Sequence, residues 1–425
     1  MSTIPLPPSI AAYLRKRGVN TPWQLASPPT RSFDGAIVIP SRAEAADLPL
    51  TLESLSRNPS PLREKTLILV VVNQRGDVSS TEAADNLVTL KQLPLWKEQF
   101  ALHTLCWIDA ATAGRELPPK QGVGLARKIG MDLALSHLNY LAGDPPLICL
   151  DADTTVQPDY LPALYHHFAS APGGGCSIPY RHRSASDQTG QQAIDRYELF
   201  LRSYILGLEL AGSPYAFHSV GSAMACRASA YVASGGMNRR LAGEDFYFLQ
   251  QLHKTSGVTS LTGTVVHPSP RASERVPFGT GRSVGDMLAQ GKQRLLFYQP
   301  VVFSLVGEWL RGVACHGGAD ATELLALASG ISPVLHDVLL QADFGTSWEN
   351  MRRNSRDPAR LAGEFHNWFD GFRTMRLIHE LSDRLYPRGE PEGAVAPLLE
   401  RAGVRGCFTC GEQLAQLRSM QGAGN

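Results

Sequence analysis

Two carboxylates separated by one small residue end a buried, apolar stretch of the chain. Asp151-Ala152-Asp153 follows four consecutive apolar residues at 147–150, which predict a short strand buried on both faces, as in a parallel sheet. Open α/β sheets bind ligands at the carboxyl ends of their strands. Two adjacent acids without local cations repel each other, and carboxylate oxygens are hard ligands. The pair therefore favours Mg²⁺ or Mn²⁺, ions often shared with substrate phosphates. The alternative is a surface turn with two solvated acids.

A second pair of acidic residues, Glu244 and Asp245, comes after a Gly-Gly turn at 235–236 and begins a predicted helix at 244–253. Acids in a first turn interact favourably with the helix dipole, so simple capping is one interpretation of the pair. A group-transfer enzyme, however, needs a general base that accepts a proton from the attacking hydroxyl. One acidic motif would then hold a metal and the other would supply the base.

A third element combines a histidine with arginines. A strand-like run ends at His267, and Arg271 and Arg282 follow around a Gly-containing segment at 279–281. A neutral imidazole can complete a carboxylate metal site, and guanidinium groups pair with a pyrophosphate in bidentate fashion. The alternatives are a histidine that bonds to the backbone and arginines that are solvated on a loop.

Two glycine-containing segments also bear on binding. Lys120 and Arg127 flank a G-V-G sequence at 122–124, which predicts a loop leading into a helix whose N–H groups attract anions. The chain contains neither a G-x-G-x-x-G fingerprint nor a G-K-[ST] phosphate loop. Small residues at 221–223 indicate that another group approaches the backbone closely there.

The elements that must position these residues alternate between strands and helices. This alternation predicts right-handed β-α-β units and a mostly parallel sheet with helices on both faces. Strands are predicted at 36–39, 66–72, 100–108, 147–150, 176–179, 217–226 and 258–266, and helices at 10–17, 45–56, 120–141, 191–210 and 244–253. From about residue 282 onward the signals are helical, with an apolar stripe at Leu361, Phe365, Trp368, Phe372 and Met375. We expect an N-terminal arm at 1–34, an α/β domain at 35–285 and a mainly helical region at 286–425.

Composition narrows the class of protein. The chain of 425 residues is 43% hydrophobic and 19% charged, as in soluble globular proteins, and its net charge of +1 gives no bulk attraction to nucleic acid. No stretch is long and apolar enough to predict a spanning helix, and peripheral membrane contact stays open. The N-terminal segment lacks the features of a signal peptide, and seven scattered cysteines favour a reducing cytoplasm. Cys407 and Cys410 form a single C-x-x-C without the second ligand pair that zinc needs.

The order of these motifs resembles the family-two glycosyltransferases and their relatives of the GT-A fold. The matching segments cover about residues 35–285 and read A-I-V-I-P-S-R at 36–42, G-V-G-L-A-R-K-I-G at 122–130, L-I-C-L-D-A-D at 147–153, G-S-A-M-A-C-R at 221–227, G-G-M…G-E-D-F at 235–246 and V-V-H at 265–267. The resemblance implies a nucleotide-sugar donor, a Mn²⁺ or Mg²⁺ ion that bridges its phosphates, and transfer to an acceptor hydroxyl.

The resemblance also assigns roles by position. It implies metal ligands at Asp151, Asp153 and His267, and a base at Asp245 with Glu244 beside it. Donor contacts are expected from Pro40, Ser41, Glu44, Asn73, Lys120, Arg127, Asp151, Arg271 and Arg282. Two departures stand out: Ala43 replaces the family's usual Asn, and Asn73 stands where an acid often holds the nucleotide base.

Three function classes remain open from the sequence. The first is a metal-dependent glycosyltransferase, which the E-D motif favours as inverting, with a retaining enzyme acting on a small acceptor as its variant. The second is a nucleotidyltransferase, which normally carries a Gly-rich basic loop after the first strand; here that segment reads P-S-R-A-E-A-A-D. The third is a non-catalytic binding protein with the helical region as an interaction module, although both acidic motifs are present.

Overall fold

The computed structural model describes residues 6–19, 21–272, 279–290, 295–355, 357–406 and 409–424, and it divides into two compact units. Unit 1 comprises residues 1–191 and 219–285, and unit 2 comprises residues 192–218 and 286–424. The helical unit thus contains the segment 192–218 in addition to the C-terminal region expected from residue 286.

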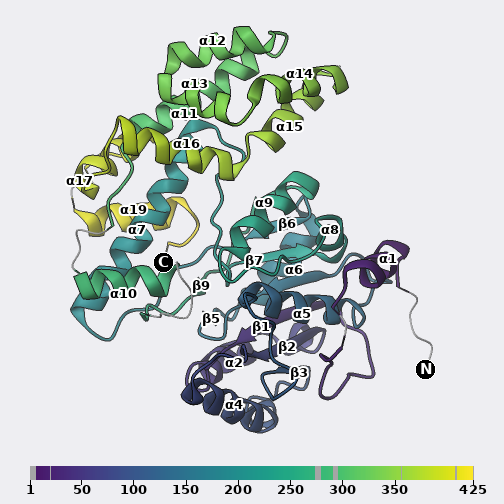
Figure 1. Cartoon of the computed structure of the whole chain (residues 1–425). Coiled ribbons are helices and arrows are strands. Elements are labelled where there is room, and N and C mark those ends of the chain that lie inside the picture. The colour runs from purple at the N-terminus through teal and green to yellow at the C-terminus, as the bar shows by residue number, and fades with distance from the viewer. Residues whose placement is uncertain are drawn as a thin grey trace. The chain divides into compact units, whose positions relative to one another are not determined.

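A seven-stranded sheet with the order β3-β2-β1-β4-β7-β6-β8 forms the centre of unit 1 (Figure 1). Its strands are β1 (Gly35–Ser41), β2 (Thr66–Asn73), β3 (Leu105–Ala110), β4 (Pro146–Cys149), β6 (Gly175–Ser177), β7 (Met224–Arg227) and β8 (Val258–Ser260). β1 pairs in parallel with β2 and β4, and β2 with β3, whereas β7 runs antiparallel to β4 and β6. Every residue of β1 and β2 is buried, which requires cover on both faces and confirms the predicted α/β class.

Helices surround this sheet. They are α1 (Pro8–Arg17), α2 (Leu48–Ser56), α3 (Ser60–Arg63), α4 (Ser80–Gln99), α5 (Val123–Leu135), α6 (Tyr160–Ser170), α8 (Ala228–Ala233) and α9 (Glu244–Ser256), while α7 (Gln188–Ala211) and α10 (Thr280–Gln290) each run from unit 1 into unit 2. α5 packs on β1 and β2. A Cβ at Gly130 of α5 would lie 2.3 Å from Val38 Cγ1, so glycine permits this close approach of helix and strand.

A separate two-stranded ribbon lies beside the main sheet. β5 (Thr155–Val156) pairs antiparallel with β9 (Val266–His267), and Thr155 is opposite His267. The ribbon therefore brings the segment that follows Asp153 next to the predicted histidine, although the two are far apart in the sequence.

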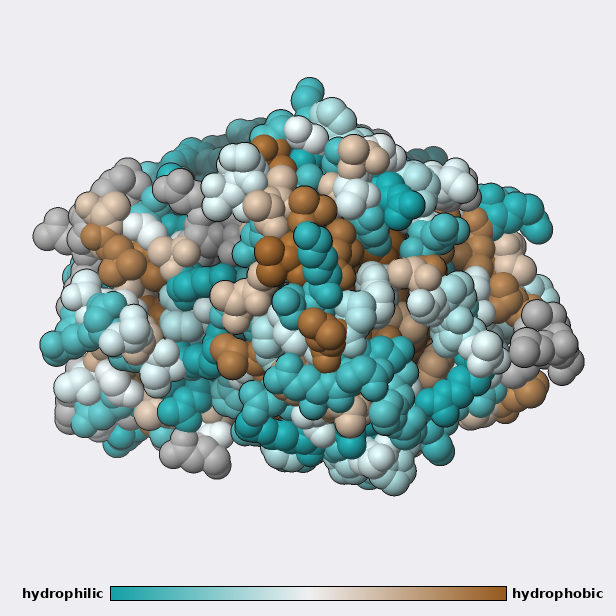
Figure 2. Space-filling model, turned by 90° about the horizontal axis from the view of Figure 1, so that it is seen from below, coloured by the Kyte–Doolittle hydropathy of each residue, from teal (hydrophilic) through white to brown (hydrophobic). Residues whose placement is uncertain are grey.

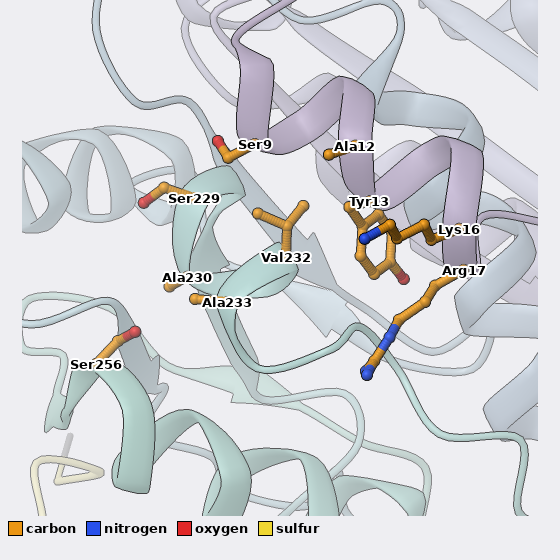
Figure 3. Close-up of a pocket in the computed structure, with 10 residues that line it drawn as sticks. All are labelled: Ser9, Ala12, Tyr13, Lys16, Arg17, Ser229, Ala230, Val232, Ala233 and Ser256. Carbon is orange, nitrogen blue, oxygen red and sulfur yellow. The ribbon is translucent and has the colours of Figure 1, made fainter.

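A buried network anchors helix α1 to α5 and α8. The Asp132 carboxylate of α5 accepts hydrogen bonds from the hydroxyls of Tyr13 at 2.9 Å and Tyr231 at 2.7 Å, and Lys128 Nζ lies 2.8 Å from it. A cavity of about 470 Å³ lies between α1 and α8, and Figure 3 shows Lys16 and Arg17 of α1 among its lining side chains. None of the predicted site residues lines this cavity.

Unit 2 is helical. Besides the shared α7 and α10 it contains α11 (Pro300–Cys315), α12 (Ala321–Ile331), α13 (Pro333–Gln341), α14 (Phe344–Asn354), α15 (Pro358–Trp368), α16 (Gly371–Arg384), α17 (Pro391–Ala394), α18 (Ala396–Arg401) and α19 (Cys410–Met420). The predicted apolar stripe is divided between two helices, because Asp370 accepts a hydrogen bond from Arg373 N and caps a new helix, α16. Phe365 is buried, whereas Phe372 is 41% exposed. Cys407 lies outside the described residues.

The surface is mixed in character. In the view of Figure 2, hydrophilic residues cover most of the face, and hydrophobic residues lie among them in small groups. No helix in the described part of the chain has the length and apolar content needed to span a bilayer.

Candidate active site

The loop after β4 presents Asp151 and Asp153, and its backbone is held from inside the protein. Thr51 Oγ1 on α2 donates a 2.8 Å hydrogen bond to the carbonyl of Ala152, and Thr154 N donates to the carbonyl of Asp151 at 3.1 Å. Ala152 is buried while both aspartate side chains remain partly exposed, at 33% and 24%. The small middle residue thus turns inward, and the two carboxylates face outward at the carboxyl end of the sheet.

Arg127 connects the two acidic motifs. This side chain on α5 is 2% exposed; its Nη2 lies 2.6 Å from Asp151 Oδ1, and its Nε lies 3.0 Å from Glu244 Oε1. Glu244 and Asp245 begin α9, so the D-A-D loop, α5 and α9 meet at one guanidinium group. We call Arg127, Asp151 and Glu244 the buried cluster.

Gly221 leaves space for the Arg127 guanidinium of this cluster. A Cβ at this position would lie 2.4 Å from Arg127 Nη2. The close approach predicted at the small residues 221–223 is therefore confirmed, and the group that approaches is the arginine itself.

A second set of ion pairs surrounds Asp153. Arg271 Nη2 lies 3.1 Å from Asp153 Oδ2 and also pairs with Glu44, while Arg271 Nη1 lies 2.6 Å from Asp47 Oδ2. Arg183 Nη2 donates to the carbonyl of Asp153 at 3.1 Å and lies 3.5 Å from Asp47 Oδ1. We call Glu44, Asp47, Asp153, Arg183 and Arg271 the open cluster, since Arg271 is 30% exposed.

The loop after β1 carries Glu44 into the open cluster. Ala43 has a φ of 53°, a left-handed conformation that suits the Asn expected here from the family better than Ala. Asn86 of α4 stabilises the loop by accepting a 2.8 Å hydrogen bond from Ala43 N. Asn73, at the end of β2, donates to the carbonyl of Ser41 at 3.1 Å, so this buried residue ties β2 to the end of β1.

His267 lies on β9 and is oriented by the backbone. Its Nδ1 is 3.0 Å from the carbonyl of Arg181. A carbonyl only accepts, so Nδ1 carries the proton in a neutral imidazole, and the lone pair is on Nε2. This is the tautomer that a histidine ligand would need.

The remaining predicted site residues are not members of either cluster. Pro40 and Ser41 are buried at the end of β1. Lys120 is exposed before α5 with a φ of 63°, and Arg282 is exposed on α10. Neither takes part in the ion pairs described for the buried and open clusters. The structure thus brings together Glu44, Arg127, Asp151, Asp153, Glu244 and Arg271.

Burial changes the acidity of three carboxyl groups. Burial, with the charge of Glu244 adding to it, raises the pKa of Asp245 to about 7. Burial also raises the pKa of Glu244, although its pairing with Arg127 opposes the shift. The pKa of Asp153 is raised to about 7 by burial and by the neighbouring charges of Glu44 and Asp151. Such shifts are typical of catalytic acids and bases, and also of structural ion-pair networks.

The donor set suits a divalent cation in composition. Carboxylates outnumber guanidinium groups across the two clusters and Asp245, and this excess of negative charge favours a hard cation at Asp151 and Asp153. Among the described residues, however, no three His, Cys, Asp or Glu side chains are grouped as a metal site. Asp151 and Asp153 each pair with an arginine, and the three-ligand set that they would form with His267 stays a prediction. A bound ion would take its other ligands from substrate and water.

Sequence reasoning missed several residues that shape the site. Asp47 and Arg183 belong to the open cluster, and Asn86 and Thr51 position its loops. Only Asp47 had a usable signal, since it lies in the same short segment as Glu44. The others reach the site through long-range contacts that no local pattern encodes.

Comparisons with known proteins bear on the family. Residues 147–339 match the family model described as glycosyl transferase family group 2. The comparison with curated protein sequences gave no match.

Solved structures with similarity to this chain include three proteins in complex with nucleotide-sugars. TarS of S. aureus, in complex with UDP-GlcNAc, shares 11% identity over 81% of this chain and 92% of its own, with a TM-score of 0.39. The mannosyltransferase PcManGT of Pyrobaculum calidifontis, in complex with GDP-Man and Mn²⁺, shares 18% identity over 85% and 95%, with a TM-score of 0.40. Glucosyl-3-phosphoglycerate synthase of Mycobacterium tuberculosis, in complex with Mn²⁺, UDP-Glc and phosphoglyceric acid, shares 15% identity over 70% and 82%, with a TM-score of 0.33.

The matched segment begins at the strand that carries the D-A-D motif and includes the E-D motif, the histidine and the first helices of unit 2. Both acidic motifs that carry the resemblance therefore lie inside it. The match confirms the resemblance that the motifs indicated: residues 147–339 are similar to the glycosyl transferase family group 2, and the sheet has the predicted, mostly parallel α/β arrangement.

Proposed function

We propose that this chain transfers a sugar from a nucleotide-diphosphate donor to an acceptor hydroxyl, with a divalent metal ion and with inversion at the anomeric carbon. The observation that carries the proposal is the position of Arg127, which contacts Asp151 at 2.6 Å and Glu244 at 3.0 Å. One residue of the metal motif and one of the base motif thus share a partner, as a single site for donor and acceptor requires.

The donor side is assigned to the strand ends β1, β2 and β4. Asp151 and Asp153 would hold Mn²⁺ or Mg²⁺, with His267 as a further ligand, and the ion would neutralise charge on the diphosphate leaving group. Charge stabilisation that grows in the transition state raises the rate. The nucleotide would contact Pro40, Ser41, Glu44 and Asn73, and the diphosphate would attract Lys120, Arg127, Arg271 and Arg282.

The acceptor side is assigned to the first turn of α9. Glu244 is engaged by Arg127, whereas Asp245 Oδ1 accepts only a 2.8 Å hydrogen bond from Phe246 N among its described contacts. A pKa of about 7 allows Asp245 to be largely ionised slightly above neutrality and to remain basic enough to take a proton. Asp245 would deprotonate the acceptor hydroxyl as it attacks the sugar from the face opposite the leaving group.

The metal assignment is tested by calorimetry with UDP-, GDP-, ADP- and dTDP-sugars in the presence of Mn²⁺ or EDTA. We expect one nucleotide series to bind and to lose at least about tenfold in affinity when Mn²⁺ is removed. Asp153→Asn should weaken binding in Mn²⁺ and should make it insensitive to EDTA. Asp77→Asn, which changes an exposed acid after the neighbouring strand β2, is the matched control. Equal affinity with and without EDTA would remove the metal from the proposal.

The base assignment is tested by turnover. Asp245→Asn should keep nucleotide affinity and lose about 10²–10⁴-fold in rate, because a positioned base acts only in the transition state. His267→Ala should instead weaken metal or donor binding. If Asp245→Asn retained its turnover, proton NMR of the product would decide between Glu244 as the base of an inverting enzyme and a retaining mechanism.

A further inference from the structure

Arg240 is an exposed arginine whose backbone is fixed at both polar groups. Its N–H donates to Asn238 Oδ1 at 3.3 Å, and its carbonyl accepts a 3.2 Å hydrogen bond from Gly124 N at the start of α5. The same Asn238 side chain donates to the carbonyl of Glu244 at 2.8 Å. The loop that carries Arg240 is therefore attached directly to the E-D turn and to the helix that carries Arg127.

The side chain of Arg240 is positioned as well. Its guanidinium carbon lies 3.7 Å from the centroid of the Tyr247 ring, a close cation–π contact. Tyr247 follows Glu244 by three residues on α9, and residues at this spacing share one face of a helix. The stacked guanidinium thus lies against α9, within one helical turn of Glu244 along the chain.

The charge of Arg240 is not neutralised by a described carboxylate. Arg127 and Arg271 each pair with two or more acids, whereas the described residues provide Arg240 with no ion pair. Stacking on a ring leaves the N–H edge of a guanidinium free to donate two parallel hydrogen bonds, which suits phosphate and carboxylate groups. An exposed arginine held at its backbone and side chain, but without a counter-ion, has the properties of a preorganised anion-binding residue.

We propose that Arg240 binds an anionic group, a phosphate or a carboxylate, on the acceptor. This inference rests on the proposed function, since the first turn of α9 faces the acceptor only if it supplies the base. The anion would belong either to a small soluble acceptor or to the headgroup of an anionic lipid, and both present the same chemistry to the guanidinium.

The test uses inorganic phosphate as the probe, with thermal stability of the full chain as the readout, because a ligand that binds only the folded state raises its stability. Phosphate is titrated against chloride at equal ionic strength, with Mg²⁺ and a saturating nucleoside diphosphate present to fill the donor side. We expect Arg240→Gln to weaken the apparent phosphate affinity by about tenfold or more.

Arg239→Gln is the matched control, because it removes the same charge from the neighbouring exposed position of the same loop. A diffuse electrostatic effect would give equal losses in the two variants and would overturn the proposal. Tyr247→Phe should keep the phosphate affinity, since the ring remains, and Tyr247→Leu should weaken it. Stabilisation by phosphate that disappears once the nucleotide is bound would assign Arg240 to the donor and would also overturn the proposal.

Two further readouts separate the possible outcomes. If no nucleotide binds at all, the proposed function fails, while the comparison of Arg240→Gln with Arg239→Gln in phosphate alone still decides the anion site. Cosedimentation with equimolar phosphatidylglycerol–phosphatidylcholine vesicles, against phosphatidylcholine vesicles, identifies the source of the anion. Arg240-dependent binding to the anionic vesicles indicates a lipid headgroup; phosphate binding without vesicle binding indicates a soluble acceptor.

Discussion

The buried and open clusters are built from the same chemical groups but differ in their access to water. In the buried cluster Arg127 is 2% exposed and Glu244 is 5% exposed, so both charges depend on each other for compensation. In the open cluster Arg271 is 30% exposed and pairs with Glu44, Asp47 and Asp153 at once. Water and ions reach the second arginine and not the first.

This difference in exposure indicates that the two clusters have different roles. A buried ion pair is costly to break, because the partner that remains is an uncompensated charge. A half-exposed arginine can exchange one carboxylate for another anion at little cost. We therefore interpret Arg127 as a fixed connection between the D-A-D and E-D motifs, and Arg271 as a counter-ion that can turn to the diphosphate when a donor binds.

The largest expected difference between the clusters is the loss in free energy of unfolding when the arginine of each cluster is replaced. Arg127→Gln should reduce the free energy of unfolding by about 3–5 kcal/mol, because it leaves Glu244 buried without a cation. Arg271→Gln should reduce it less, by about 1–3 kcal/mol, since Asp47 and Asp153 remain partly hydrated and only Glu44 is buried. Urea denaturation of both variants, followed by circular dichroism, measures the difference.

The double variant Arg127→Gln/Glu244→Gln is the control for this comparison. Replacing both charges by neutral amides leaves no buried charge, so most of the lost stability should return. Equal destabilisation by Arg127→Gln and Arg271→Gln would show that the two clusters do not differ in the way proposed.

The contrast between the clusters also shows which site residues a local sequence pattern can predict and which it cannot. Asp151, Asp153, Glu244 and Asp245 were predicted as site residues because each pair is adjacent in the sequence and lies at the end of a recognisable strand or the start of a helix. The strands β1, β2 and β4 were found because their apolar runs are continuous. Local pattern is sufficient for such elements.

The ion-pair and hydrogen-bond partners of the site residues could not be predicted, because they depend on tertiary contacts. Arg271 was expected to face a diphosphate, and it pairs with Asp47, more than two hundred positions away in the sequence. Helix α4, which supplies Asn86, was not predicted at all; Pro94 in its interior disrupts the usual helix signal. The apolar stripe after Leu361 was divided by the cap at Asp370, since spacing alone does not show where one helix ends and another begins.

A smaller effect concerns pH and depends on Asp245, which is adjacent to the buried cluster. The pKa of Asp245 is raised to about 7, above its ordinary value of about 3.9, because burial disfavours the carboxylate. The base proposed here must be ionised to act, so kcat/KM should fall about tenfold per pH unit below 7. Stability should change in the opposite direction and decline as pH rises from about 4 to about 7, because the folded state retains the proton that the unfolded state releases.

Asp245→Asn isolates this contribution. The pKa of Asp153 is also raised to about 7 and that of Glu244 is raised as well, so the pH dependence of stability that remains in Asp245→Asn comes from these two carboxyl groups. A variant whose stability profile coincides with that of the parent would show that Asp245 does not titrate in this range.

The smallest expected effect lies in the loop that carries Glu44 into the open cluster. Ala43 has a φ of 53°, where a side chain is strained and glycine is not. Ala43→Gly should therefore raise the free energy of unfolding by about 0.5–1 kcal/mol, even though glycine makes the unfolded chain more flexible. The hydrogen bond from the residue 43 N–H to Asn86 is kept, so nucleotide affinity should not change. Ala46→Gly, three residues along the same loop and outside the left-handed region, should instead lower stability. Opposite signs for the two substitutions, measured by urea denaturation, would establish that backbone strain is stored at Ala43; equal signs would contradict it.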